Sequence, residues 1–413
     1  MTTPRLPDQA LAEPIDRVSR RWTFGVVLAN VGVFAAWIGP IQVLLAQQAD
    51  AIDPANKEFV FGLVTGVGAA ISVVANPFFG AVSDLTTSRL GRRAPWVLAG
   101  AIGGVAGLLI LAVSGSTAGM LLGWCLVQLF CNALLAAITA AVPDQVPTVQ
   151  RGSVGGWVAL AQTLGGLAGV GLATAFGGIR AGYIACAVFL LVSVLPYLRA
   201  SGDRRLPSRP VVRLMDFVRG FWVSPRRYPD FGWAWLTRFL LNLGNALGTL
   251  YLFFYLQDAV GYGDPGTGVL ILVAIYSVFV VLTAVWSGGW SDRIGRRKVF
   301  VTWAGVVMAL GALVLAVWPT WSGAIAGAIV LGIGFGVYLS VDFALLTEVL
   351  PSARDRAKDL GVINIANSLP QVIAPAIAAP VVRVLGGYPV LYVLAAAVTL
   401  LGAVLVKKIK SVA

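Results

Sequence analysis

The chain is built from long runs of apolar residues that alternate with short polar stretches. A helix needs about 20 apolar residues to cross the roughly 30 Å apolar core of a bilayer, and twelve runs are close to that length. Backbone groups inside a bilayer must bond internally, so we predict helices rather than strands. The predicted spans are 22–46, 58–82, 95–115, 119–142, 153–178, 180–198, 231–257, 266–289, 298–318, 321–345, 359–382 and 388–406.

Six of these runs precede, and six follow, a polar stretch at 199–230 that is rich in arginine. We therefore predict an all-α membrane protein with twelve transmembrane helices in two pseudo-symmetric six-helix bundles. The predicted domains are 1–198, a cytoplasmic linker at 199–230, and 231–413. The linker is interpreted as a solvated segment with an amphipathic piece on the lipid surface, and a regulatory or partner site is the alternative.

Composition supports a membrane protein and changes how the charge is understood. Apolar residues make up 58% of the chain and charged residues only 12%, whereas soluble domains carry about 25% charged residues. The mean hydropathy is +0.85. The net charge of +12 does not indicate a nucleic-acid partner, because the basic residues lie in short loops between apolar runs and not on a soluble domain.

Lysine and arginine are distributed unevenly between the two sets of loops. Of the 30 such residues, Arg238 lies within a predicted span, 26 fall in one set of loops, and only Lys57, Arg180 and Arg383 fall in the other. Cytoplasmic loops carry the excess of positive charge, so both termini are predicted to be cytoplasmic. The expected location is the inner or plasma membrane of the cell, with multiple passes. Residues 1–21 are polar and do not resemble a secretory signal.

The sequence offers no set of residues suited to catalysis. It contains no histidine and three cysteines, which are Cys125, Cys131 and Cys186. All three lie inside apolar runs, with no spacing typical of a disulfide framework or a metal site. The segment GIGFG at 332–336 lies within a span and is interpreted as helix packing. We therefore expect no enzyme activity, no cofactor and no metal.

One polar cassette occurs twice, each time between the second and third spans of a half. It reads GAVSDLTTSRLGRR at 80–93 and GGWSDRIGRR at 288–297. The segment LANVG at 28–32, in the first span, also matches LLNLG at 240–244, in the seventh. Two related six-helix halves are typical of carriers that rock about a central site.

The doubled cassette resembles the signature loop of the major facilitator superfamily, and the resemblance covers essentially the whole chain. In the first copy four residues, LTTS, separate Asp84 from Arg89, a form similar to the glycoside-pentoside-hexuronide and sucrose-transporter branch. FALLTEVLP at 343–351 and RDRAKDLG at 354–361 resemble the second half of that branch. The resemblance implies transport by alternating access, with spans one, four, seven and ten lining the cavity, and a monomer as the default.

The cassettes are predicted to form a latch at the cytoplasmic mouth. Their glycines allow close helix approach, and their aspartates can pair with arginines and hold the two halves closed. In the alternative interpretation these arginines only set the topology. The predicted gating residues are Gly80, Asp84, Arg89, Arg92, Arg93, Gly288, Asp292, Arg293, Arg296 and Arg297.

Two ionisable residues lie at membrane depth, where a charge costs several kcal/mol. Arg238 is in span seven and Asp342 is in span ten, at similar depth. We predict that they pair, and that protonation of Asp342 couples protons to transport. The alternatives are a structural ion pair, or an Arg238 that reaches the membrane interface. Spans one and four hold no carboxylate, which leaves facilitated diffusion open.

Neutral amides and aromatic residues are frequent in the predicted cavity-lining spans, and they suit a polar, uncharged cargo. Each one could instead join neighbouring helices. The candidate substrate-binding residues are Asn30, Trp37, Gln42, Gln128, Asn132, Gln162, Asn242, Asn245, Tyr251, Tyr255, Tyr338, Asn364, Asn367 and Gln371.

These observations predict a secondary active transporter for a small polar solute, a sugar or glycoside, with protons as the coupling ion. The first alternative is a proton-driven efflux antiporter for small organic molecules or drugs. The second is a transporter-like sensor or scaffold that moves no cargo. The expected partners are the solute, protons and the lipid bilayer, with no nucleic acid.

Overall fold

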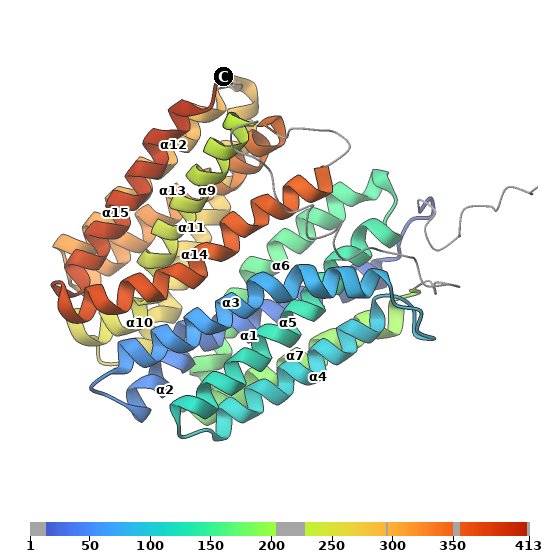
Figure 1. Ribbon diagram of the computed structural model, residues 1–413, viewed down its shortest axis with the longest axis horizontal. Coiled ribbons are helices and arrows are strands. Elements are labelled where there is room, and N and C mark those ends of the chain that lie inside the picture. The colour runs from blue at the N-terminus through green and yellow to red at the C-terminus, as the bar shows by residue number, and fades with distance from the viewer. Residues whose placement is uncertain (1–13, 204–227, 295, 350–355, 411–413) are drawn as a thin grey trace, which may run out of the picture. The chain divides into compact units, whose positions relative to one another are not determined.

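The computed structural model describes residues 14–203, 228–294, 296–349 and 356–410 (Figure 1). Every regular element within these ranges is helical. The greater part of the predicted linker at 199–230 lies outside the described residues, as does the proline-bearing end of the 343–351 segment.

The helices of the first half of the chain are α1 (Arg20–Gly39), the π-helical segment η1 (Pro40–Leu44), α2 (Leu45–Ile52), α3 (Lys57–Asp84), α4 (Ala94–Val113), α5 (Thr117–Gln145), α6 (Thr148–Ala175) and α7 (Ile179–Ala200). Those of the second half are α9 (Pro229–Leu250), α10 (Leu252–Phe254), the π-helical segment η2 (Tyr255–Val260), α11 (Pro265–Ile294), α12 (Arg297–Val317), α13 (Trp321–Val349), α14 (Arg356–Val384), α15 (Gly387–Leu405) and the 3-10 turn η3 (Val406–Lys408).

Eleven helices in the described part of the chain are long and apolar enough to cross a membrane. A twelfth span results if Pro229–Leu250 and Leu252–Val260, which meet at an angle of 40°, count as one broken span. The twelve predicted spans coincide with these helices, and their ends differ by a few residues. The prediction of an all-helical, multi-pass membrane protein is therefore confirmed.

The chain divides into two compact units. One contains Met1–Gln48 and Ala70–Val212, and the other contains Ala49–Ala69 and Arg213–Ala413. The division therefore passes through the continuous helix α3, whose first turns belong to the second unit.

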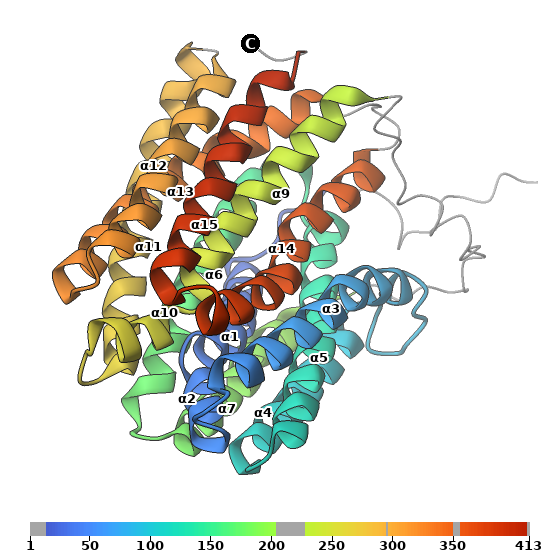
Figure 2. The ribbon, with the colours of Figure 1, turned by 60° about the vertical axis from the view of Figure 1, so that its left-hand side comes forward.

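The two units repeat the same pattern of helix packing. In the first unit α1 packs on α6 and α7, and α4 packs on α5 and α7. In the second unit α9 packs on α14 and α15, and α12 packs on α13 and α15. Figure 2 shows α12, α13 and α15 running alongside one another in the second unit. The packing therefore supports the internal repeat that the cassettes indicate in the sequence.

The repeat extends to single residues at the first helix of each half. Gly32 of α1 lies against Ser193 of α7 so closely that a side chain at position 32 would overlap the serine hydroxyl. Gly244 of α9 lies in the same way against Thr399 of α15. Gly32 and Gly244 are the matched glycines of LANVG and LLNLG, so this short echo in the sequence marks a shared site of close helix approach.

A π-helical segment continues the first helix of each half. In η1 the amide of Leu45 bonds to the carbonyl of Pro40. A proline inside a helix lacks the N–H group and displaces the preceding turn, and a π turn is one way to absorb this change. In the second half, η2 ends at Gly261, which has φ 68°, a conformation that suits glycine.

A buried cation connects the start of α3 to η2 within the second unit. Lys57 Nζ lies 2.7 Å from Asp258 Oδ1 and 3.6 Å from Asp50 Oδ1. Gln257 accepts a hydrogen bond from Lys57 and donates one to Asp50, and Tyr388 donates to Asp258. This network attaches the segment Ala49–Ala69 to the unit in which it is found.

Candidate functional site

Each unit contains a cluster of polar side chains within its apolar helices. The first, which we call the Arg238 cluster, lies in the second unit and consists of Arg238, Asn242, Tyr338, Asp342 and Asn367. The second, the Asn132 cluster, lies in the first unit and consists of Ser72, Asn76, Gln128 and Asn132.

Helix geometry brings the Arg238 cluster together. Arg238 and Asn242 are four residues apart on α9, and Tyr338 and Asp342 are four residues apart on α13, so each pair shares a helix face. Asn367 comes from α14. Both α13 and α14 pack on α9 in this unit, and the three polar faces therefore meet.

Arg238 forms the centre of its cluster. Its Nη1 donates to Asp342 Oδ2 in an ion pair, and its Nε donates to Asn367 Oδ1 at 2.7 Å. The exposed fraction of the side chain is 13% for Arg238 and 5% for Asp342. Each charge is thus neutralised by the other, and removal of either partner would leave the second buried and unpaired, which costs several kcal/mol.

Neutral groups complete the cluster. Asn242 Nδ2 donates to Tyr338 Oη at 3.1 Å and to Asn367 Oδ1 at 3.2 Å. Asn367 thus accepts hydrogen bonds both from the ion pair and from a neutral amide. Any change in the position of Arg238 would therefore change the hydrogen bonds available to Asn242 and Tyr338.

The Asn132 cluster contains no charge. Asn132 Nδ2 donates to the Gln128 carbonyl at 2.7 Å and to Gln128 Oε1 at 3.4 Å. Asn132 Oδ1 accepts from Ser72 Oγ and from Asn76 Nδ2, both at 3.4 Å. The cluster offers amide and hydroxyl groups of the kind that bind a neutral polar molecule.

Three candidate residues near the first unit's α1 carry buried polar atoms that have no partner among the described atoms. These atoms are Asn30 Oδ1, Trp37 Nε1 and Gln42 Oε1. A buried polar atom without a hydrogen bond costs about 1–3 kcal/mol, and native structures contain few of them. Eight other buried side-chain atoms of the described residues share this property, and a water molecule or a polar ligand that reaches such an atom satisfies it.

Several other candidates lie outside the two clusters. Asn245 accepts from Tyr276 Oη at 3.2 Å. Gln162 and Gln371 are exposed, and neither joins the hydrogen bonds described above for the two clusters. The side chain of Asn364 lies outside the described part.

Two tyrosines expected at the binding site serve helix packing in this structure. Tyr251 Oη donates to the Glu58 carbonyl at 3.3 Å, and Tyr255 Oη donates to the Leu315 carbonyl at 2.9 Å. Tyr255 also packs edge-on against Tyr392. The role of Tyr251 and Tyr255 in solute binding stays a prediction.

The first cassette forms an ion-pair cluster within one unit. Arg93 donates to Asp144 Oδ2 at 2.7 Å, to Asp84 Oδ1 at 2.6 Å and to Ser83 Oγ. Arg92 donates to Asp144 Oδ2 at 2.9 Å. Burial disfavours the charged form of Arg93, yet the hydrogen bond and charge of Asp144, with Asp84, raise its pKa above the usual value. The cassette thus joins the end of α3 to the end of α5.

The other predicted gating residues of the two cassettes lie in different surroundings. Arg89 is exposed. Gly80 has no described atom within 4 Å of the position that a Cβ would occupy, and its expected role in close helix approach stays a prediction. In the second cassette Arg293 and Arg296 are exposed and Arg297 begins α12. The side-chain surroundings of Gly288 and Asp292 lie outside the described part.

The model of the Major Facilitator Superfamily matches residues 24–273 and 265–411, which together span nearly the whole chain. The chain belongs to the major facilitator superfamily. Its resemblance to the glycoside-pentoside-hexuronide and sucrose branch within this superfamily stays a prediction.

Among curated superfamily proteins, the chain is similar to Myo-inositol transporter 3C of Cryptococcus neoformans var. grubii, with 32% identity over 170 residues. The match covers 38% of this chain and 28% of that protein. Myo-inositol transporter 3A of the same organism is 28% identical over 180 residues, covering 41% of this chain and 30% of that protein. The matched region is thus under a third of each relative.

Solved structures share the superfamily fold at low sequence identity. The crystal structure of a peptide transporter, POT, has a TM-score of 0.78 and 12% identity, and the alignment covers 97% of this chain and 98% of that one. The human organic anion transporter MFSD10 has a TM-score of 0.67 and 17% identity, covering 94% of this chain and 99% of that one. These similarities concern the fold alone.

Three polar residues of this superfamily member contact predicted site residues but were not themselves predicted from the sequence. Ser72 and Asn76 of α3 contact Asn132, and Tyr276 of α11 contacts Asn245. Ser72 and Asn76 are four residues apart in a predicted span, a spacing that could have indicated a polar face. Tyr276 is followed by Ser277 in an otherwise apolar run, but no polar residue lies three or four positions from Tyr276 on either side, so the sequence offers no comparable signal.

Proposed function

We propose that the chain is a secondary active transporter for a small, polar, uncharged solute of the sugar or polyol class. Membership of the superfamily and the partial similarity to myo-inositol transporters support transport of this class. The observation that carries the choice of solute is the set of unpartnered buried atoms of Asn30, Trp37 and Gln42. Solute hydroxyl groups can donate to the two oxygens and accept from the indole N–H.

In this proposal, residues 1–198 and 231–413 act as the two six-helix halves and 199–230 acts as the linker. The halves alternate between conformations that open the site to one side of the membrane at a time. The ion pairs of the first cassette, with the predicted ones of the second, hold the cytoplasmic side closed and release it when the halves move. The protein works as a monomer in the cell membrane, with both termini in the cytoplasm.

Proton coupling is proposed to act through Asp342. A proton on Asp342 removes the negative charge that faces Arg238, so the ion pair is lost. Arg238 is then free to shift its second hydrogen bond, at Asn367, which also contacts Asn242. Protonation and solute binding are therefore linked through one shared amide.

The solute site is tested with a pair of glutamines at the end of the first span. Gln42→Ala removes an oxygen that has no internal partner, so the protein should keep its thermal stability while solute affinity falls at least roughly tenfold, about 1.4 kcal/mol. Binding of myo-inositol and hexoses to purified protein is measured by calorimetry.

Gln48→Ala is the matched control. Gln48 Nε2 donates to the carbonyls of Leu111 and Ser114, and Gln48 Oε1 accepts from Tyr183. This variant should lose stability, with no selective loss of affinity in the protein that remains folded. If Gln42→Ala binds solute as well as the unaltered protein, Gln42 does not contact the solute.

Coupling is tested in proteoliposomes with Asp342→Asn, which keeps the shape of the side chain and cannot be charged. Uptake driven by a pH gradient should be lost, while exchange of labelled for unlabelled solute across the membrane continues. Proton-driven uptake by this variant would contradict the proposed role of Asp342. Solute efflux driven by inward proton movement would favour the antiporter alternative.

A further inference from the structure

A groove along α11 contains none of the candidate solute-binding residues, although it ends at Arg293, one of the predicted gating residues. It has a volume of about 640 Å³ and is lined by Val281, Leu282, Val285, Trp286, Trp290 and Arg293. This volume falls within the range of about 300–1,000 Å³ that is common for small-molecule sites. The described lining residues carry no amide and no hydroxyl side chain, and the charge among them is the guanidinium of Arg293, so this lining does not suit a sugar.

The groove lies on a different face of α11 from the one that packs in the bundle. The packed face carries Thr283, which donates to the Ile333 carbonyl at 3.2 Å, and Ser287, which is 2.7 Å from Ser340; both partners are in α13. Leu282, Trp286, Trp290 and Arg293 recur at intervals of four, four and three residues, which places them on one stripe of the helix.

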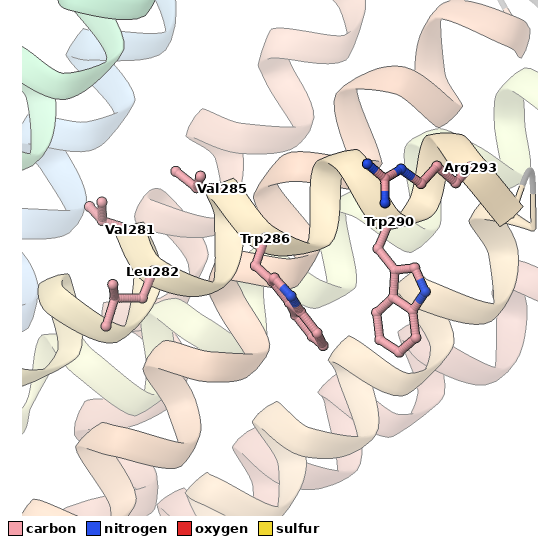
Figure 3. A pocket seen from close by; sticks show the side chains of 6 residues that line it. All are labelled: Val281, Leu282, Val285, Trp286, Trp290 and Arg293. Atoms are coloured by element: carbon pink, nitrogen blue, oxygen red, sulfur yellow. The ribbon is translucent and has the colours of Figure 1, made fainter.

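Large apolar side chains on this stripe are exposed. Trp286 is 65% exposed and Trp290 is 47% exposed, and their ring centroids are 4.7 Å apart. Trp290 also packs edge-on against Phe300 of α12. Figure 3 shows both indole rings extending from the same side of α11, with Arg293 one turn beyond them. Tryptophan favours the boundary between the apolar core and the headgroups of a bilayer.

The groove ends in positive charge. Arg293 lies in the last turn of α11 and is exposed, as is Arg296 directly after it. Lys298 Nζ donates to the Ile409 carbonyl, which brings the exposed Lys407 and Lys408 of η3 to the same end of the unit. A guanidinium pairs well with a phosphate group through two parallel hydrogen bonds.

We propose that the α11 groove binds an anionic phospholipid. The acyl chain lies along Leu282, Val285 and Trp286, and the phosphate group pairs with Arg293 beside Trp290. Along α11, the apolar residues, the tryptophan pair and Arg293 follow one another in the same order as the acyl chain, the interfacial region and the headgroup of a phospholipid. This site is separate from the solute site, so each can fail without the other.

The test measures lipids retained by the purified full chain with native mass spectrometry, using phosphatidylglycerol and phosphatidylcholine with identical acyl chains. Phosphatidylglycerol should be retained at least roughly tenfold more strongly, about 1.4 kcal/mol. Arg293→Gln should remove this preference and Arg293→Lys should retain most of it. Trp286→Ala should weaken retention of both lipids.

Matched controls come from exposed residues outside the groove. Arg180→Gln removes an exposed arginine in the other unit, and Trp303→Leu removes an exposed tryptophan of α12; both should leave retention unchanged. The proposal is overturned if the two headgroups are retained equally, or if Arg180→Gln has the effect of Arg293→Gln. It is also overturned if Arg293→Gln and Trp286→Ala change no lipid retention, since the groove is then covered by protein.

Discussion

At the scale of single residues, the absence of a side chain sets how closely two helices can approach. Gly244 lies against Thr399 of α15, whereas Gly248, one turn further along α9, has no described atom within 4 Å of a Cβ. The same amino acid therefore has different roles at two neighbouring positions of one helix.

This difference gives a test of the packing. Gly244→Ala should lower the midpoint of thermal unfolding by several degrees, because overpacking a helix contact costs about 1–3 kcal/mol. Gly248→Ala should leave it unchanged or raise it slightly, since alanine favours helix by about 1 kcal/mol over glycine. The midpoints are measured on purified protein in detergent.

Thr399→Ala in the Gly244→Ala background removes the overlapping hydroxyl and should restore part of the lost stability. Equal midpoints for the two single alanine variants would show that α9 and α15 do not approach as closely as described.

At the scale of helices, the start of α4 depends on a residue from beyond the end of α7. Asp203 Oδ2 accepts hydrogen bonds from the amides of Arg93 and Ala94, the latter at 2.9 Å. Gly91, with φ 98°, leaves room for this carboxyl, because a Cβ there would lie 2.5 Å from it. Burial raises the pKa of Asp203 above its usual value, although the two amide donors oppose the shift.

The raised pKa predicts how Asp203 contributes to stability as pH changes. The folded protein holds this proton more tightly than the unfolded chain, so the stabilisation is fully present below the ordinary value of 3.8. It is lost as pH rises through the raised pKa. As pH rises from about 4 to about 7, the unfolding midpoint of the unaltered protein should therefore fall relative to that of Asp203→Asn. A difference that is constant, or that shifts the other way, would contradict the raised pKa.

The start of α3 is a second case in which a helix depends on a distant segment. Lys57→Met removes the cation that contacts Asp258 and Asp50. Backbone amides of Ala49–Ala69 should then exchange with solvent at least roughly tenfold faster, about 1.4 kcal/mol, measured by hydrogen–deuterium exchange.

A double variant that exchanges the charges, Lys57→Asp with Asp258→Lys, should restore part of the protection. Asp264→Asn serves as the control, because it changes an aspartate whose described hydrogen bonds to Gly266, Thr267 and Gly268 stay at the start of α11.

At the scale of the whole molecule, the number of crossings and the charge of the loops predict the orientation. With twelve spans, both termini are predicted to lie on one side of the membrane, and the distribution of lysine and arginine predicts that this side is the cytoplasm. Reporter fusions after Ala413 and at the N-terminus should both report a cytoplasmic location. A reporter inserted beside Lys57 should report the opposite side. Termini on opposite sides would exclude an even number of spans.

The sequence by itself determined the elements and their duplication. Apolar runs of about 20 residues have one stable form in a bilayer, a helix, and for this reason the ends of the twelve spans could be placed within a few residues. The doubled cassette and the LANVG and LLNLG pair indicated two related halves, because residues at a close helix contact or a charged helix end keep their spacing when a unit is repeated.

Only the tertiary structure decided which polar groups meet. Periodicity places Asn132 and Gln128 on one helix face, but it cannot show that Ser72 and Asn76 come from another helix to contact them. In the same way, periodicity cannot show that the hydroxyls of Tyr251 and Tyr255 bond to the carbonyls of Glu58 and Leu315. Contacts between residues far apart in the chain depend on how each helix is rotated and tilted against its neighbours. That rotation follows from packing over the whole unit, which no short stretch of sequence specifies.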